Sequence, residues 1–490
     1  MDDAFSIFDA PPSASDTEPD AKRGKFLSSP VLPLCQRFVQ AHVQSVTADL
    51  MACKMEVSAR IAKDLKDAVE LFAGGDSALD ESRRAAENAA QSAWAIMSDP
   101  SAPLSHRPLA KEAYVLAHII LCGACASLDD QPARALRSLD HAFIFGGLTD
   151  VYRDCAELLD QPVADATEGA SDSPVTATSM PPPPPIGTTT ILPVERHACP
   201  GTVEEFRALK RPGAPLLLEG VGAGWPAMRK WADMSWLKRQ FGARLVPVEI
   251  GSLDGRKQSA QGESAEAAGW GERIMSLSAF IDAFLSGEGA TTPELTSGDV
   301  TVSRPIEAVV SDGSGDGDGD GRGAAPGGAA GGGGDDATTA RSGIGYLAQH
   351  PLFEQLPRLR HDFAVPPLCA AGRLQHTNAW LGPAGTVTPL HFDSYDNVLT
   401  QVFGYKRVRL YEASQTHLLY PKEGGGGGID AQGNVSAVDV EAPDLEAHPE
   451  FARAVGTEAI LGPGDGLFIP AGCWHHVRSL TPAFSISFWF

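Results

Sequence analysis

The sequence predicts an α+β protein, with an all-helical N-terminal domain followed by a C-terminal β-domain built as a barrel or a double-sheet jelly roll. Alanine-rich, amphipathic segments dominate the first third of the chain. Beyond residue 190, short runs of β-branched and aromatic residues are separated by Gly/Pro turns, as in antiparallel sheets. A Pro/Ser/Thr-rich stretch lies between these regions, and we place the domain boundary there.

The N-terminal segment, residues 1–28, is acidic, polar and proline-containing, which predicts disorder. It lacks the basic and apolar regions of a signal peptide. No apolar run approaches the roughly 20 residues that span a bilayer. We therefore expect the protein in the nucleus, with the cytoplasm as a further compartment.

Residues 29–160 are predicted to form the helical domain. The segment 112–128 is a long apolar helix, and a second helix over 131–147 follows after a polar turn at Asp129 and Asp130. Antiparallel pairs of this kind suggest helical hairpins arranged loosely as in tetratricopeptide proteins. No clean repeat of about 34 residues is present, so the similarity is one of architecture only.

Cysteines are sparse in this chain. The eight cysteines are scattered, which argues against a disulfide framework. Cys122 and Cys125 form a C-x-x-C motif, but no second pair stands at zinc-ribbon spacing. We therefore interpret this pair as small buried helix residues rather than as a metal or redox site.

Low-complexity segments divide the rest of the chain. Residues 161–190 contain five consecutive prolines from Pro181 and are predicted to be a stiff spacer, with an SH3-type ligand as the alternative. Within the β-domain, 191–490, insertions near 311–340 and 423–434 are predicted to be surface loops. The Asp-Gly repeat of the first insertion places glycine where an EF-hand needs glutamate, which excludes that calcium site.

The formal net charge of -23 limits the possible partners. Such a chain repels phosphate backbones, so we expect no direct nucleic-acid binding. It attracts basic segments, such as histone tails or ribosomal proteins, through long-range electrostatics. Acidic disordered segments that improve solubility are the simpler explanation of the same charge.

Potential metal ligands occur at the ends of two predicted strands. His391 and Asp393 are two residues apart, and alternate residues of a strand point to the same face. A third ligand must come from a neighbouring strand, and "CWHHV" offers His475 and His476, of which only one can point into the barrel. Two histidines and one carboxylate are typical of non-haem Fe(II) oxygenases.

Lys406 adds a cationic group to this region. In a strand that begins after the turn at Gly404, it shares strand parity with Val408 and Leu410, so we expect it to point inward. Arg407 would face outward. A buried lysine needs an anion, and the 5-carboxylate of 2-oxoglutarate would satisfy it. The alternative is a lysine at a hairpin tip that extends to solvent.

The region 378–421 resembles the core of JmjC-domain Fe(II)/2-oxoglutarate oxygenases, a cupin family, and it is especially similar to a subfamily named for lysine demethylation. The resemblance covers about 191–490 apart from the insertions, and the helical region resembles the same subfamily more weakly. The other segments that carry it are 213–231, 244–252, 345–357 and 468–490.

The resemblance implies a role for several individual residues. It assigns iron to His391, Asp393 and His475 and leaves His476 outside the site. It assigns the co-substrate pocket to the following residues: Tyr346, Thr388, Asn397 and Lys406 as 2-oxoglutarate contacts, and Trp380 as a neighbouring aromatic. An aromatic core is the alternative role of Tyr346 and Trp380.

The implied activity is that of a dioxygenase that uses Fe(II), 2-oxoglutarate and O2 on side chains of basic proteins. We favour arginyl hydroxylation, because Glu249 in an apolar strand is suited to a substrate guanidinium and no chromatin-reading motif is present. Glu249 could instead be exposed or paired internally. Histone lysine demethylation and a catalytically inactive cupin scaffold are the alternatives. The last predicted strand reaches Phe490 without the helical extension through which some relatives dimerise, so we expect a monomer.

Overall fold

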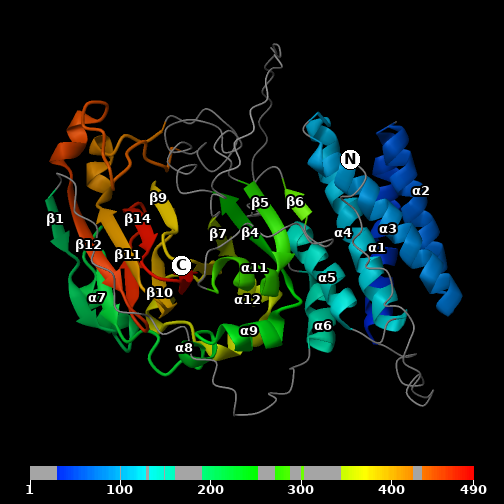
Figure 1. The fold of residues 1–490 in the computed structure, drawn as a ribbon, viewed down its shortest axis with the longest axis horizontal. Helices are drawn as coiled ribbons and strands as arrows, with labels where there is room; N and C mark the ends of the chain where they lie inside the picture. The colour runs from blue at the N-terminus through cyan, green and yellow to red at the C-terminus, as the bar shows by residue number, and fades with distance from the viewer. Residues whose placement is uncertain are drawn as a thin grey trace, which may run out of the picture.

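The computed structural model describes residues 30–53, 55–99, 101–128, 132–147, 149–160, 190–251, 271–286, 300–302, 344–422 and 433–490. The predicted disordered segment 1–28 lies outside these residues. So do the spacer 161–190, except its last residue, and nearly all of both predicted insertions. The predicted α+β class is confirmed, with a helical region followed by two sheets (Figure 1).

The helical region is a bundle around one apolar helix. Helix α4 is covered by α1, α3 and α5, because an apolar helix must bury all of its faces. This arrangement differs from the tetratricopeptide-like array that we expected. The helices are α1 (Val31–Ala52), α2 (Glu56–Leu71), α3 (Asp76–Ser98), α4 (Arg107–Leu128), α5 (Pro132–Gly146) and α6 (Asp150–Leu159), with a 3-10 turn at Leu104–His106.

Helix α4 corrects one expectation from the sequence. Judged by length and composition alone, α4 could cross a membrane, and it is the one helix of the described residues that meets this test. We expected no apolar run of this length. In the structure, 78% of its apolar stretch is buried inside the protein. The helix therefore has the composition that its central place in the bundle requires.

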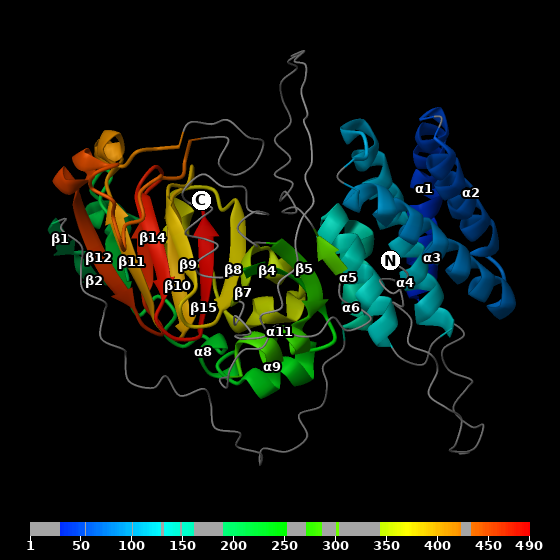
Figure 2. The ribbon, with the colours of Figure 1, turned by 45° about the horizontal axis from the view of Figure 1, so that its top comes forward.

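The β-domain consists of two sheets packed face to face (Figure 2). The five-stranded sheet has the order β1-β12-β11-β14-β9 and the ten-stranded sheet the order β2-β3-β13-β10-β15-β8-β7-β4-β5-β6. The strands are β1 (Thr190–Pro193), β2 (Arg196–Ala198), β3 (Leu216–Glu219), β4 (Leu245–Gly251), β5 (Gly271–Ser276), β6 (Val300–Val302), β7 (Ile344–His350), β8 (His376–Gly382), β9 (Val387–His391), β10 (Asn397–Phe403), β11 (Lys406–Tyr411), β12 (Val455–Leu461), β13 (Gly466–Ile469), β14 (Trp474–Ser479) and β15 (Ala483–Trp489).

Most of the short helices pack on the larger sheet, whereas the 3-10 helices Ala413–Leu418 and Pro449–Arg453 pack against the smaller one. Trp231, directly after α8, and Phe280 of α11 belong to a core that also includes Phe484 of β15. The α-helices are α7 (Val203–Leu209), α8 (Ala227–Lys230), α9 (Met234–Phe241), α11 (Leu277–Phe284) and α12 (Leu352–Gln355), and the 3-10 helices are Pro357–Asp362, Pro367–Ala371, Ala413–Leu418 and Pro449–Arg453.

A buried ion-pair network joins the helical bundle to the β-domain. Arg244, which is 2% exposed, donates to both carboxylate oxygens of Asp140 on α5 and to Asp160 at the end of α6. It also donates to the hydroxyl of Tyr152, which in turn donates to the Gln355 carbonyl at 2.5 Å. The contact between α5 and β4 lies at this junction (Figure 1). The network therefore fixes how the bundle lies against the β-domain.

Candidate metal and co-substrate site

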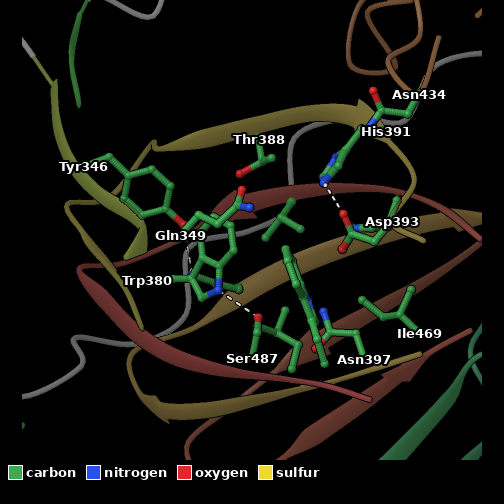
Figure 3. Close-up of a pocket in the computed structure, with 15 residues that line it drawn as sticks. Tyr346, Gln349, Trp380, Thr388, His391, Asp393, Asn397, Asn434, Ile469 and Ser487 are labelled. Atoms are coloured by element: carbon green, nitrogen blue, oxygen red, sulfur yellow. Dashed lines mark hydrogen bonds and ion pairs between the residues drawn. The ribbon is translucent and has the colours of Figure 1, made fainter. Parts of the chain in front are cut away.

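A pocket of about 140 Å³ opens between the two sheets (Figure 3). It brings together eight of the residues that the sequence singles out: Tyr346, Trp380, Thr388, His391, Asp393, Asn397, Lys406 and His475. Figure 3 shows His391 and Asp393 pointing toward each other on one side of the pocket, with Tyr346 and Trp380 on the other.

Three potential metal ligands converge at one end of the pocket. The register of β14 against β9 places His475 directly opposite His391, and Asp393 follows the end of β9. Asp393 Oδ1 is 3.8 Å from His391 Nε2, and Asp393 Oδ2 is 3.7 Å from His475 Nε2. The ligand atoms all lie within 4.8 Å of one another. These distances between the ligand atoms are longer than a hydrogen bond. They leave room for a cation that all three side chains could bind at once.

The backbone fixes the tautomer of both histidines. Nδ1 of His391 lies 2.8 Å from the Pro389 carbonyl, and Nδ1 of His475 lies 3.0 Å from the Cys473 carbonyl. A carbonyl only accepts, so each Nδ1 carries the proton and each Nε2 presents a lone pair toward Asp393. Burial, together with His391, lowers the pKa of His475 to about 4, which keeps this imidazole neutral at pH 7. Neutral imidazole is the form that ligates metals.

His476 points to the opposite face of the same sheet, as strand parity predicts. It pairs in register with Arg409, and burial lowers its pKa to about 3. The outward face is nevertheless buried, because Glu441 covers it and pairs with Arg407 and Arg478. Burial alone would raise the pKa of Glu441. The hydrogen bond from Arg478, together with the nearby positive charges, outweighs burial and lowers this pKa to about 2. Outward-facing residues of β11 are therefore not exposed to solvent.

Lys406 occupies the other end of the pocket. It lines the pocket, which confirms the inward orientation, and it is 1% exposed, which excludes the solvent-directed alternative. Its Nζ donates to the hydroxyl of Tyr346 at 3.4 Å. Within the part of the chain that the structure describes, no carboxylate pairs with Lys406, and burial lowers its pKa to about 7. An anionic ligand would supply the counter-charge that the described residues do not provide.

Polar atoms without partners also line the pocket. Asn397 Oδ1, Asn434 Oδ1 and Trp489 Nε1 are buried and make no hydrogen bond within the described residues. Trp380 Nε1 donates to Ser487 Oγ at 2.7 Å, which fixes the indole ring beside Tyr346. Buried polar groups normally have a partner, so the Trp489 N–H suits an acceptor such as a ligand carboxylate, and the two amide oxygens suit a donor such as water. The pocket as a whole suits a metal ion together with a small dicarboxylate.

Several pocket residues were not predicted from the sequence. Asn434 stands at the end of the predicted surface insertion 423–434, yet it donates to the Phe392 carbonyl and lines the pocket. Ser487 and Trp489 are alternate residues of β15 and therefore point to the same face. Strand parity could have indicated that both line the pocket. Gln349 has a positive φ of 49° that no sequence signal anticipates. The other unpredicted lining residues are Leu399, Ile469 and Val477.

Glu249 lies beside the pocket but not on its wall. It is half-buried on β4 and stands opposite Tyr346 in the pairing of β4 with β7. It is not among the residues that line the cavity. The half-buried position excludes the alternative that Glu249 is exposed and leaves internal pairing open, so its role toward a substrate stays a prediction.

Comparisons with known proteins agree with this geometry. The model of a family described as "Cupin-like domain" matches residues 202–490. The chain is 34% identical to Lysine-specific demethylase 8 of Xenopus tropicalis over 296 residues, which is 59% of this chain and 51% of that protein. Lysine-specific demethylase 8 of Danio rerio is 34% identical over 303 residues, 60% of this chain and 58% of that protein. Jumonji C domain-containing protein 5 of Drosophila melanogaster is 31% identical over 294 residues, 59% of this chain and 57% of that protein. The match thus spans little more than half the length of each relative.

Proposed function

The chain belongs to the cupin-like family and carries a JmjC domain, and from this premise we propose that it is an Fe(II)- and 2-oxoglutarate-dependent protein oxygenase. One observation carries the proposal: a single pocket holds a His-Asp-His donor set at one end and, at the other, a buried lysine that no carboxylate of the described residues neutralises. The first group suits a divalent metal, and the second suits a carboxylate.

Each pocket residue has a defined part in this proposal. His391, His475 and Asp393 would hold Fe(II) through two neutral nitrogens and one carboxylate. Lys406 would bind the distal carboxylate of 2-oxoglutarate, with the Tyr346 hydroxyl as a second donor. When bound, iron and 2-oxoglutarate supply the activation of O2, with succinate and CO2 as by-products.

Thr388 and Asn397 would complete the recognition of the co-substrate. Thr388 pairs in register with Val477 on β14, so its side chain shares the inner face with His475. The Asn397 amide has a buried oxygen without a partner and can orient a ligand beside the metal. The apolar side chains around them, such as Leu399 and Ile469, would exclude water from the reacting groups.

The substrate that we propose is an arginine side chain in a basic protein. The net charge of -23 favours encounters with basic partners. Glu249, beside Tyr346 at the edge of the pocket, is suited to accept two hydrogen bonds from a guanidinium. Lysine demethylation is the second candidate, and it is favoured by the names of two similar proteins.

A product-resolved assay separates these activities. The protein is incubated with Fe(II), 2-oxoglutarate, O2 and two basic peptide sets, one with unmodified arginine and one with methylated lysine. Intact-mass analysis is expected to show one added oxygen on arginine, together with succinate. Formaldehyde release with loss of a lysine methyl group would favour demethylation instead. Peptide binding without succinate would indicate an inactive scaffold, and His391→Ala is the control that should lose all turnover.

A further inference from the structure

The helical bundle contains a second group of metal-ligating side chains, in a different domain from the pocket. Cys35 of α1, Cys122 of α4 and Cys155 of α6 are all 0% exposed. Their sulfur atoms lie within 4.8 Å of one another, and the Sγ atoms of Cys35 and Cys155 are 3.8 Å apart. Three separate helices thus direct one sulfur each toward the same point.

The spacing of these sulfurs suits a metal ion. A metal–thiolate bond is about 2.3 Å long, so sulfurs around one ion lie about 3.8 Å apart in a tetrahedral site and about 4.0 Å apart in a trigonal one. The Cys35–Cys155 distance of 3.8 Å already fits, and since all three sulfurs lie within 4.8 Å of one another, the other two distances need to shorten by no more than about 1 Å. Side-chain rotation and small helix shifts are sufficient for a change of this size.

Gly123 explains how the helices approach so closely. A Cβ atom at this position would lie 2.6 Å from Phe72 Cζ and 3.0 Å from Cys35 Cβ. Any side chain next to Cys122 on this face would therefore push α1 away from α4. The glycine keeps Cys35 against α4 at the level where Cys122 points.

We propose that Cys35, Cys122 and Cys155 form a binding site for a thiophilic d10 metal ion, and that Cu(I) is the ion that this donor set fits best. Structural Zn(II) sites use four protein ligands, and within the described ranges no fourth Cys, His, Asp or Glu joins the group. Soft thiolates select Cu(I), for which three sulfur donors are sufficient. Each thiol that becomes a thiolate ligand releases one proton to solvent.

Such an ion would act on the junction between the domains. Helix α6 carries Cys155 and, one turn earlier, Tyr152, whose hydroxyl contacts Arg244 and the Gln355 carbonyl. An ion that ties α6 to α1 and α4 would hold Tyr152 in place. Because α6 has only ten residues, its local opening gives an ion access to the buried sulfurs.

The test uses the full chain with His391→Ala and His475→Ala, so that the pocket contributes no metal binding. The protein is titrated without oxygen with Cu(I) buffered by a chromophoric chelator, and in a parallel arm with Zn(II). We expect one Cu(I) per chain, a thiolate-to-copper absorption band and a higher Tm. Cys35→Ala and Cys155→Ala should each abolish stoichiometric binding. Cys125→Ala is the matched control, because Cys125 is a buried cysteine of α4 outside the group, and it should bind normally.

A second measurement avoids variants that fail to fold. The otherwise unaltered chain is warmed with an alkylating reagent, with and without Cu(I), and the labelled cysteines are identified by mass spectrometry. Bound copper should protect Cys35, Cys122 and Cys155 and leave the labelling of Cys125 unchanged. Absence of protection, or equal copper binding by Cys35→Ala, would overturn the site. A disulfide between Cys35 and Cys155 in the isolated protein would also overturn it, and uptake of Zn(II) in preference to Cu(I) would overturn the choice of ion.

Discussion

Replacing Lys406 tests the co-substrate half of the proposed site. In the pocket, the Lys406 ammonium faces the Tyr346 hydroxyl and no carboxylate of the described residues, and burial lowers its pKa to about 7. A charge-assisted hydrogen bond to a buried carboxylate contributes roughly 1.5–3 kcal/mol. Lys406→Met should therefore weaken 2-oxoglutarate binding about 10- to 150-fold at pH 6.5.

The pH dependence of binding follows from the same pKa. Only the protonated lysine offers a charge, so the apparent Kd should rise by a factor of 1 + 10^(pH − pKa), with a pKa of about 7. Between pH 6.5 and 8.5 this amounts to a loss of affinity of about 25-fold. In Lys406→Met the same pH change should leave the affinity nearly constant, because the titrating group is absent.

The same shift has a consequence for stability, with a definite sign. The folded pKa of Lys406, about 7, lies below the roughly 10.4 of an unfolded lysine, so the unfolded chain binds more protons between these values. The ligand-free protein should therefore gain stability from this group as the pH rises from about 7 toward 10. Below pH 7 the folded protein must keep a buried charge at Lys406. The free energy of unfolding of Lys406→Met should therefore exceed that of the original protein by the largest amount in this pH range.

The assay is calorimetric titration of the Mn(II)-loaded protein with 2-oxoglutarate in the absence of oxygen, from pH 6.5 to 8.5. Lys66→Met is a matched control, since Lys66 is an exposed lysine of α2 and its loss should not change the affinity. A Kd that stays constant with pH in the original protein would refute the reasoning. So would a Lys406→Met variant whose Kd at pH 6.5 is within twofold of the original.

Further substitutions test other parts of the structure. His475→Ala should abolish Fe(II) binding measured by equilibrium dialysis, whereas His476→Ala should retain it, and the reverse order would mean that the other histidine is the ligand. Arg244→Met leaves the buried Asp140 carboxylate without its cation and should lower the free energy of unfolding by about 3–5 kcal/mol in denaturant titration; a loss below 1 kcal/mol would show that the network is dispensable. Gly404→Ala should reduce the soluble yield or lower Tm by several degrees, because φ is +72° and the new Cβ would lie 2.0 Å from the Pro482 carbonyl oxygen; an unchanged Tm would mean that the turn can rearrange.

The sequence by itself predicted the fold class, several strands of the β-domain and eight of the residues that line the pocket. The family resemblance selected His475 as the inward histidine. Strand parity correctly predicted that His475 and His476 point to opposite faces and that Lys406 points inward, because a two-residue period is a local property of the chain. The predicted strands that carry Glu249 and Lys406 form as β4 and β11, and the last predicted strand forms as β15. Local alternation and turn residues were sufficient for these features.

Only the tertiary structure decided which distant residues meet. Cys35, Cys122 and Cys155 form a group because α1, α4 and α6 pack together, and their spacing along the chain carries no sign of it. Arg407 has outward parity yet is buried, because Glu441 comes from a segment whose path the sequence does not reveal. The same is true of Asn434 in the pocket and of the contact between Arg244 and Asp140. Such contacts form where the packing of helices and strands brings complementary surfaces and opposite charges together. Local sequence patterns do not encode which elements pack against each other.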